Sequence, residues 1–235
     1  MRWLPLTFED PFREKSHPLK PTSNISRRRR TALSDGGPEY TAKREELVRI
    51  AATLFRERGY TATRLIDIAN AAGLDRATVY YYVGSKEELF RESVEGILDA
   101  NLAQAELISA DKSLDANMRI RNIVVQMILS YEQNFPQMYV YIQEQMHQVA
   151  QEKTPWAQEI VRKTKRFEAI VKNLIKEGIE RGEFRADLQV RLAANALFGM
   201  INWMHRWHVP RRPSSAEEIA NTFSQIFCDG MLVRR

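Results

Sequence analysis

The sequence contains a single cysteine among 235 residues, and no run of about 18 apolar residues that could cross a membrane. One thiol, Cys228, excludes a disulfide within the chain and any metal site built from several thiolates, and it suits a reducing compartment. We expect Cys228 to be a small buried hydrophobic residue. The first residues also lack the long apolar core of a secretion signal. These absences predict a cytoplasmic protein without a membrane partner.

Motifs typical of enzymes are missing as well. The chain has no glycine-rich phosphate loop after a strand, no G-x-S-x-G elbow and no HExxH pair, so we expect no catalytic activity and no cofactor. His205 and His208 lie one helical turn apart, but no third ligand accompanies them. We therefore expect two surface histidines and no metal site. The sequence has no repeat of fixed period, so it does not indicate a solenoid.

The positive charge is modest and partly concentrated near the start of the chain. The formal net charge is +5, which suits nucleic acid as a partner without requiring it. Residues 1–40 are rich in proline and contain the run Arg27–Arg30. Such a segment cannot bury enough apolar surface to offset its ordering entropy, so we expect a mobile basic arm. Two interpretations stay open: Arg27–Arg30 contact phosphate or the minor groove, or the arm is a solvated linker.

From residue 41 onward, apolar residues recur with helical periodicity, and no segment alternates with period two. Breakers at Gly59, Gly73 and Gly84 divide the first part into short helices, and Ser85 with Glu88 forms a capping box for a longer one. The third helix begins after Asp75, a good N-cap, and turns Val79 and Val83 inward. Further helices are expected at about 115–134, 136–151, 156–181, 187–208 and 215–231. The fold class is therefore all-α.

The two short helices joined at Gly73 predict a helix-turn-helix, whose second helix enters the major groove of DNA. This helix reads DRATVYYY and exposes Arg76, which can reach a phosphate or a guanine edge. Its tyrosine hydroxyls can donate to phosphate oxygens while the rings cover sugar or a thymine methyl. For Tyr82, DNA contact and packing inside the protein are equally good interpretations. Lys86, at the start of the next helix, is expected to contact phosphate.

The stretch from residue 42 to residue 90 resembles the N-terminal domain of the TetR family of transcriptional regulators. The matching positions are Leu47, Ala51, Leu54, Phe55, Gly59, Ile68, Ala69, Ala72, Gly73, Thr78, Tyr80, Val83, Lys86 and Leu89. The resemblance implies that DNA is faced by Arg76, Thr78, Tyr80, Tyr81 and Lys86. It also implies a phosphate contact at the start of the first motif helix. Because Arg64 stands where serine or threonine is common, we expect Thr63 to cap that helix, and both residues are candidate DNA contacts.

The same resemblance implies a DNA-binding domain over residues 41–101 and a ligand-binding and dimerisation domain over residues 102–235. Flexible and amphipathic side chains in the second domain could line an adaptable cavity, with plain core packing as the alternative. The candidates are Met127, Tyr131, Met138, Tyr141, Ile142, Gln145, Met146 and Trp203. The last two helices carry broad apolar stripes. In the family such helices form a homodimer, which fits a double-stranded DNA operator with inverted half-sites.

The segment from Gly178 to Trp207 is similar to family members that respond to acyl-coenzyme A in fatty-acid or sterol breakdown. An acyl chain would suit the Met- and Tyr-rich interior. The candidates to meet the phosphates are Arg162, Lys163, Lys165, Arg166 and Arg206. We therefore expect a homodimeric repressor released from its operator by a small hydrophobic ligand, with acyl-coenzyme A as the first candidate. A free aromatic or cationic compound beside Glu144 is one alternative, and a helical protein-interaction module is an alternative of another class.

Overall fold

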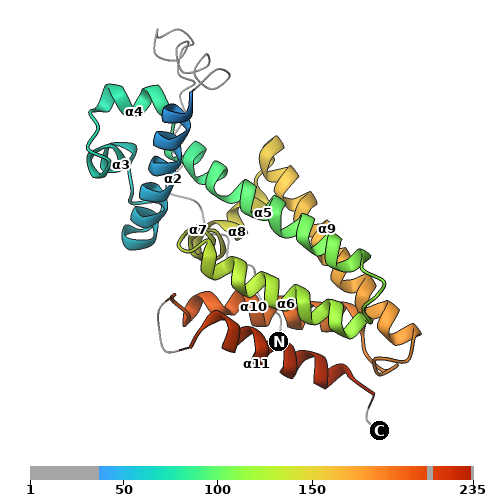
Figure 1. Cartoon of the computed structure of the whole chain (residues 1–235). Helices are drawn as coiled ribbons and strands as arrows, with labels where there is room; N and C mark the ends of the chain where they lie inside the picture. The colour runs from blue at the N-terminus through green and yellow to red at the C-terminus, as the bar shows by residue number, and fades with distance from the viewer. Residues whose placement is uncertain (1–36, 211–213, 234–235) are drawn as a thin grey trace, which may run out of the picture.

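The computed structural model of the chain describes residues 37–210 and 214–233, and every extended regular element within them is a helix (Figure 1). One isolated bridge joins Phe184 to Leu232. The all-α prediction is confirmed. The expected basic arm lies outside the described residues, Arg27–Arg30 included, except for its last positions. Those positions begin a helix at Pro38, slightly before the expected boundary at residue 40.

Three helices form the N-terminal unit. They are α2 (Pro38–Arg58), α3 (Leu65–Ala71) and α4 (Arg76–Tyr82). Gly59, with a φ of 85°, ends α2, and Gly73, with a φ of 66°, makes the turn before α4. Both conformations disfavour any residue with a Cβ. The small core between the helices contains Leu47, Ala51, Leu54, Phe55, Ile68, Ala69, Val79 and Val83. The predicted inward positions of Val79 and Val83 are therefore confirmed.

Helix α5 (Lys86–Ala110) joins this unit to the rest of the molecule. The Ser85 side chain accepts a hydrogen bond from the Glu88 amide, as the predicted capping box requires. Near its start, Leu89 and Val94 are buried against the N-terminal unit, whereas Leu102 and Ala105 are buried further along. The domain boundary expected between residues 101 and 102 falls inside this uninterrupted helix. The two units consequently share α5.

The C-terminal part is a bundle of longer helices with one irregular segment. Its elements are α6 (Ala116–Gln133), α7 (Gln137–Val140), the π-helix η1 (Tyr141–Gln145), α8 (Met146–Gln151), α9 (Pro155–Glu180), α10 (Val190–Trp203), the 3₁₀ turn η2 (Met204–Arg206) and α11 (Ala216–Met231). The helix expected at 136–151 is confirmed as helical from residue 137 to residue 151, but a π-helical turn that was not expected divides it. The helix expected at 187–208 is shorter at both ends and finishes in a 3₁₀ turn.

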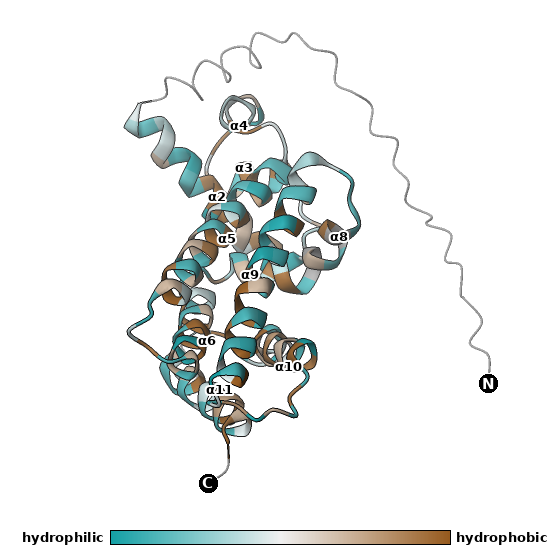
Figure 2. Ribbon diagram, turned by 90° about the vertical axis from the view of Figure 1, so that its right-hand side faces the viewer, coloured by the Kyte–Doolittle hydropathy of each residue, from teal (hydrophilic) through white to brown (hydrophobic). Residues whose placement is uncertain are grey.

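Packing in the bundle is set by α6 and α9. Helix α11 packs along α6, and α9 packs against α5, α6 and α10. Near the C-terminal end of α2, α7 contacts that helix, so the N-terminal unit also touches the bundle directly. Figure 2 places α4 at the opposite end of the molecule from α10 and α11. No helix formed by residues 37–210 and 214–233 is both long and apolar enough to span a bilayer.

An ion pair between the buried Arg119 and the partly exposed Glu177 fastens α6 to α9. Arg119 has no exposed surface, and its guanidinium donates to the Glu177 carboxylate at 2.6 Å. It also donates to the backbone oxygen of Ser109 at 3.0 Å. Lys112 and Arg181 approach the same carboxylate. Hydrogen bonds from Arg119 lower the pKa of Glu177 to about 2.

Gly178 follows Glu177 on α9 and permits a close crossing. A Cβ at Gly178 would lie 2.2 Å from the Phe184 ring, closer than two carbon atoms can approach. The ring of Phe184 therefore packs directly on the backbone of α9, and this packing turns the chain toward α10.

Candidate DNA-binding site and effector region

Helix α4 lies at one end of the molecule (Figure 1). Asp75 caps it, accepting from the Thr78 amide at 2.8 Å and from the Thr78 hydroxyl at 2.7 Å. These bonds hold the pKa of the Asp75 carboxyl below its usual value. Arg76 and Ala77 are exposed, and Thr78 is half-buried. The side of α4 opposite Val79 and Val83 is thus accessible to a partner.

The three consecutive tyrosines have different surroundings. The Arg76 guanidinium lies 6.0 Å from the centroid of the Tyr80 ring. Tyr82 stacks on Tyr40 of α2 with centroids 5.1 Å apart, and Tyr81 meets Tyr40 edge-on at 5.5 Å. Tyr82 therefore packs on α2, and a DNA contact through its remaining exposed surface stays a prediction. Tyr80 and Tyr81 are half-buried and keep part of their surface accessible.

Arg44 of α2 fixes the C-terminal end of α4. Its guanidinium donates to the backbone oxygen of Tyr82 at 2.6 Å, to Glu88 at 2.9 Å and to Glu92 at 2.9 Å. Burial alone would lower the pKa of Arg44, but the hydrogen bonds to Glu92 and Glu88 raise it above its ordinary value. One side chain thereby joins α2, α4 and α5. Sequence reasoning missed Arg44, because no local pattern marks a contact 38 residues away.

Two of the predicted DNA contacts are engaged inside the protein. Thr63 is fully buried, and its hydroxyl donates to the backbone oxygen of Gly59 at 2.8 Å, so the expectation that it caps α3 is wrong. The N-cap is Arg64, whose amide donates to Asp67 at 2.9 Å. The buried Thr63 side chain cannot reach a phosphate.

Lys86 behaves similarly. Its ammonium donates to the backbone oxygens of Tyr60 at 2.7 Å, Thr61 at 3.2 Å and Thr63 at 2.9 Å. An ammonium has three hydrogens, so these bonds match its donor capacity. The role that the structure gives Lys86 is to close the loop between α2 and α3. A phosphate contact at Lys86 would require exchange of these bonds and stays a prediction.

The structure places Arg64 and Arg76 around the same hollow, which the sequence alone did not indicate. Both line a hollow of about 270 Å³ between α3 and α4, together with Leu65, Ile66, Val79 and Tyr80. The Arg64 side chain is 77 % exposed. Two accessible guanidinium groups around one hollow suit the phosphate backbone of DNA, which arginine binds with a planar fork of donors.

The candidate effector residues divide into two groups. Tyr131, Met138 and Tyr141 are buried, and burial raises the pKa of both tyrosines. Met127 and Ile142 pack partly buried against the same core. Met146 and Trp203 are 38 % and 62 % exposed, so they lie at the surface rather than in the core, and their contact with an effector stays a prediction. The side chain of Gln145, like that of Glu144, lies outside the described residues.

The basic residues expected to meet coenzyme A phosphates are mostly paired. Lys163 contacts Glu95 and Asp99, and Arg166 contacts Glu106 at 2.6 Å. Arg162 pairs with Glu159. Arg206 differs, because its guanidinium lies 5.4 Å from the centroid of the exposed Trp203 ring. The structure thus leaves Arg206 and Trp203 together on the surface at the end of α10.

His208 is only 2 % exposed, so the expectation of a surface histidine is wrong there. Its Nε2 lies 3.5 Å from the carboxylate of Glu132. Exposed apolar side chains gather on α10, α11 and the segment between them. They are Leu192, Trp203, Trp207 and Ile226, each at least 46 % exposed.

A helix-turn-helix with a basic hollow, joined through α5 to a separate helical bundle, defines a DNA-binding regulator with two domains. The chain matches two family profiles: "Bacterial regulatory proteins, tetR family" over residues 47–93, and "Tetracyclin repressor-like, C-terminal domain" over residues 113–231. The protein belongs to the TetR family of transcriptional regulators. Members of this family bind operator DNA and act as dimers.

Similar proteins include two with related names. The HTH-type transcriptional repressor KstR2 of Rhodococcus jostii is 30% identical over 191 residues, which cover 81% of this chain and 92% of that protein. The structure of the ketosteroid transcriptional regulator KstR2 of Mycobacterium tuberculosis superposes with a TM-score of 0.76 at 28% identity, covering 81% of this chain and 95% of that one. AibR, solved with isovaleryl coenzyme A and operator DNA, shares the fold with a TM-score of 0.65 at 21% identity, covering 78% of this chain and 97% of that one.

Proposed function

We propose that the protein is a homodimeric repressor that binds an operator with inverted half-sites and leaves it when a small hydrophobic effector binds. The observation that carries the DNA-binding part is the hollow between α3 and α4, where Arg64 and Arg76 flank Tyr80 at the exposed end of the molecule. The names of its relatives support the repressor part, since the KstR2 proteins are transcriptional repressors. Such a regulator acts in the cytoplasm by binding, with no reaction of its own.

The proposed effector is an acyl-coenzyme A thioester with a hydrophobic acyl group. The buried side chains of Tyr131, Met138 and Tyr141 would repack around the acyl group, because methionine and aromatic residues adapt to irregular apolar shapes. The exposed Trp203 ring with the Arg206 guanidinium beside it offers a stacking surface and a cation for the nucleotide end. The description of one relative as a ketosteroid regulator supports an effector derived from a sterol.

The proposed release is a population shift. An effector weakens operator binding only to the extent that it prefers the conformation in which the two α4 helices no longer match successive major grooves, about 34–36 Å apart. Binding of an acyl-coenzyme A alone would therefore not establish the mechanism. Release has to be measured.

The test begins with selection of bound fragments from genomic DNA, which yields the operator. Fluorescence anisotropy then follows its release across acyl-coenzyme A thioesters, their free acids and cationic dyes. Release by thioesters alone is expected. Release by dyes or free acids, with every thioester inactive, would contradict acyl-coenzyme A as the effector. The proposal that the protein is a repressor would still stand.

A helical protein-interaction module is the competing class. Affinity for DNA that falls steeply with salt concentration separates the two, because only a phosphate-binding protein releases counterions. Absence of affinity for any duplex at low salt would favour the interaction module.

A further inference from the structure

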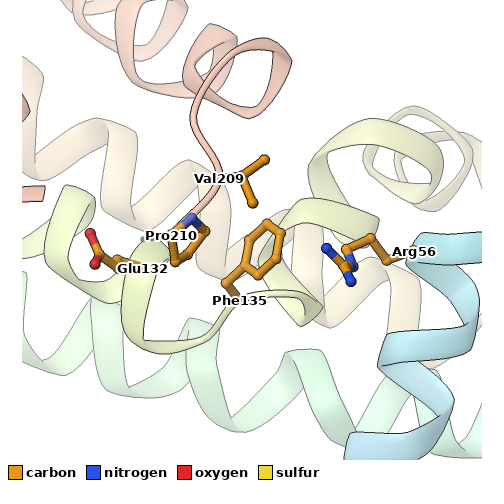
Figure 3. A pocket seen from close by; sticks show the side chains of 5 residues that line it. All are labelled: Arg56, Glu132, Phe135, Val209 and Pro210. Carbon is orange, nitrogen blue, oxygen red and sulfur yellow. The ribbon is translucent and has the colours of Figure 1, made fainter. Parts of the chain in front are cut away.

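A second cavity lies where the DNA-binding unit meets the bundle. This junction pocket has a volume of about 440 Å³ and is lined by Arg56, Glu132, Phe135, Val209 and Pro210 (Figure 3). Arg56 belongs to the end of α2, Glu132 and Phe135 to the end of α6 and the turn after it, and the other two to the segment after η2. A volume of this size falls within the range of about 300–1,000 Å³ typical of small-molecule sites. The pocket therefore touches both domains.

The junction pocket holds two opposite charges separated by apolar surface. The Arg56 guanidinium lies 5.3 Å from the centroid of the Phe135 ring. Figure 3 shows Arg56 on one side of Phe135 and Glu132 on the other side, beyond Pro210. No ion pair joins Arg56 to Glu132 among the contacts that the described residues make, and the carboxylate nearest to Arg56 is that of its neighbour Glu57, at 3.6 Å.

The Glu132 carboxylate is poorly compensated. Its Oε2 atom is buried and lies 3.5 Å from Nε2 of the buried His208, and neither atom has a hydrogen-bond partner within the described part of the chain. A buried carboxylate oxygen without a donor is costly. A cationic group that reached the other oxygen from the pocket would offset much of that cost.

We propose that the junction pocket binds a small zwitterion whose ammonium and carboxylate are separated by an apolar chain, as in an ω-amino acid. The ammonium pairs with Glu132, the carboxylate pairs with Arg56, and the chain crosses Phe135 and Pro210. A simple anion would face the repulsion of Glu132, and a simple cation would face that of Arg56. An α-amino acid, whose two charged groups share a single carbon atom, has no apolar chain to cross Phe135 and Pro210 between the two partners.

Occupancy of this site ties α2 to α6. Because α2 belongs to the DNA-binding domain and α6 to the bundle, the ligand favours one arrangement of the two domains over others. By linkage, it changes operator affinity by the same factor by which operator changes ligand affinity. This site adjoins the region proposed for the hydrophobic effector, because the Tyr131 and Phe135 rings meet with centroids 6.1 Å apart, but its charged partners Arg56 and Glu132 do not belong to that region.

The test uses 6-aminohexanoate as the probe and the full chain as the protein. Hexanoate and hexylamine are the single-charge controls, and alanine is the short zwitterion. Isothermal titration calorimetry is expected to show 6-aminohexanoate binding at least about tenfold more tightly than each control, as loss of one charge-assisted hydrogen bond implies. Equal binding of hexanoate, hexylamine or alanine would overturn the proposal, and so would no binding at all.

Three variants locate the site. Arg56→Gln and Glu132→Gln are each expected to weaken 6-aminohexanoate binding about tenfold or more, whereas Arg58→Gln, which removes an exposed charge from the same helix outside the pocket, should leave it unchanged. Glu132→Gln also alters the contact with His208, so Arg56→Gln, with its side chain one third exposed, keeps the test decisive if the other variant unfolds. Full affinity in Arg56→Gln would remove the site from this pocket.

Regulation is tested on the operator. Saturating 6-aminohexanoate is expected to shift the operator dissociation constant of the natural chain by at least about threefold and to leave that of Arg56→Gln unchanged. An identical shift in both proteins, or none in either, would contradict the proposed coupling.

Discussion

Arg44 is the side chain at which three helices of the DNA-binding domain meet. It supplies a planar set of donors to one backbone oxygen and two carboxylates. The backbone oxygen is that of Tyr82, the last residue of α4. A change at Arg44 should therefore alter the direction of α4 even though Arg44 itself need not touch DNA.

We predict that Arg44→Gln lowers operator affinity about tenfold and the free energy of unfolding by about 2 kcal/mol, as expected for lost hydrogen bonds to charged partners. Arg44→Lys should show losses smaller than those of Arg44→Gln, because lysine keeps the charge but lacks the planar fork of donors. Anisotropy titration and urea denaturation measure the two effects. Natural affinity in Arg44→Gln would show that α4 needs no such anchor.

Arg76 and Tyr80 are predicted to contribute differently to recognition. Arg76→Ala should weaken operator binding and relax base preference if the guanidinium reads a guanine, at a cost of about 1–3 kcal/mol. Tyr80→Phe removes only a hydroxyl and should weaken binding to all duplexes alike. Competition titrations with single-base operator variants measure both effects. The control is Arg49→Ala on α2, which also removes one positive charge. Unchanged affinity in both test variants would place another surface in the groove.

For single residues, the sequence predicted those features that depend only on nearby residues along the chain. Asp75 as a cap and Val79 as a buried residue depend only on spacing, and both were predicted. Thr63 was misjudged as a helix cap, and the loop contacts of Lys86 were not foreseen, because the partners of both side chains are backbone oxygens near the loop after α2, brought close by tertiary packing. A side chain with hydrogen-bonding capacity looks the same in the sequence whether its partner is DNA or a loop.

Among the elements, the division of residues 137–151 was the main feature hidden from the sequence. Neither glycine nor proline occurs between Tyr141 and Gln145, so no breaker marks the π-helical turn. A π-helix inserts one extra residue in a turn, and surrounding packing rather than local preference selects it. Breakers such as Gly59, Gly73 and Pro155 did locate the ends of neighbouring helices.

The ion pair between α6 and α9 leads to a prediction with a pH dependence. Glu177→Gln should lower the free energy of unfolding by about 2–3 kcal/mol at pH 7, because Arg119 stays buried without its carboxylate. The folded-state pKa of Glu177 is about 2, below its ordinary value of 4.5. The stability from this group is therefore complete above about pH 4.5 and is lost as the pH falls toward 2.

Denaturation at pH 7, 5 and 3 compares the natural chain with Glu177→Gln. The difference in unfolding free energy should be equal at pH 7 and 5 and smaller at pH 3. Glu180→Gln, on the exposed side of the same helix, is the control and should show little change. A difference that stays constant down to pH 3 would contradict the assigned pKa.

For the whole molecule, we expect a second copy to bind at the exposed apolar side chains of α10 and α11. Leu192 and Ile226 are 49 % and 63 % exposed, a large apolar area for a surface facing water. The broad stripes of these two helices were visible in the sequence. The sequence did not show which of their residues face outward, because that depends on how α11 lies along α6.

We predict that Ile226→Glu shifts the protein from dimer to monomer, because it would bury an unpaired charge in the interface. Its exposed position in one chain means that the fold itself should persist. Sedimentation velocity at matched concentrations measures the shift, and Asn221→Glu, exposed on another side of α11, is the control. A folded dimer of Ile226→Glu would move the interface elsewhere.

The continuity of α5 has a mechanical consequence. With 25 residues, it is a rigid rod about 37 Å long, anchored in the bundle at one end and in the DNA-binding domain at the other. A tilt of about 5° at the end held in the bundle displaces the end in the DNA-binding domain by roughly 3 Å, because of the length of the helix. Two such displacements of opposite sense in a dimer would alter the separation of the recognition helices by up to about 6 Å, nearly two base-pair steps of about 3.4 Å. Small rearrangements around an effector are thereby amplified at the DNA by leverage alone.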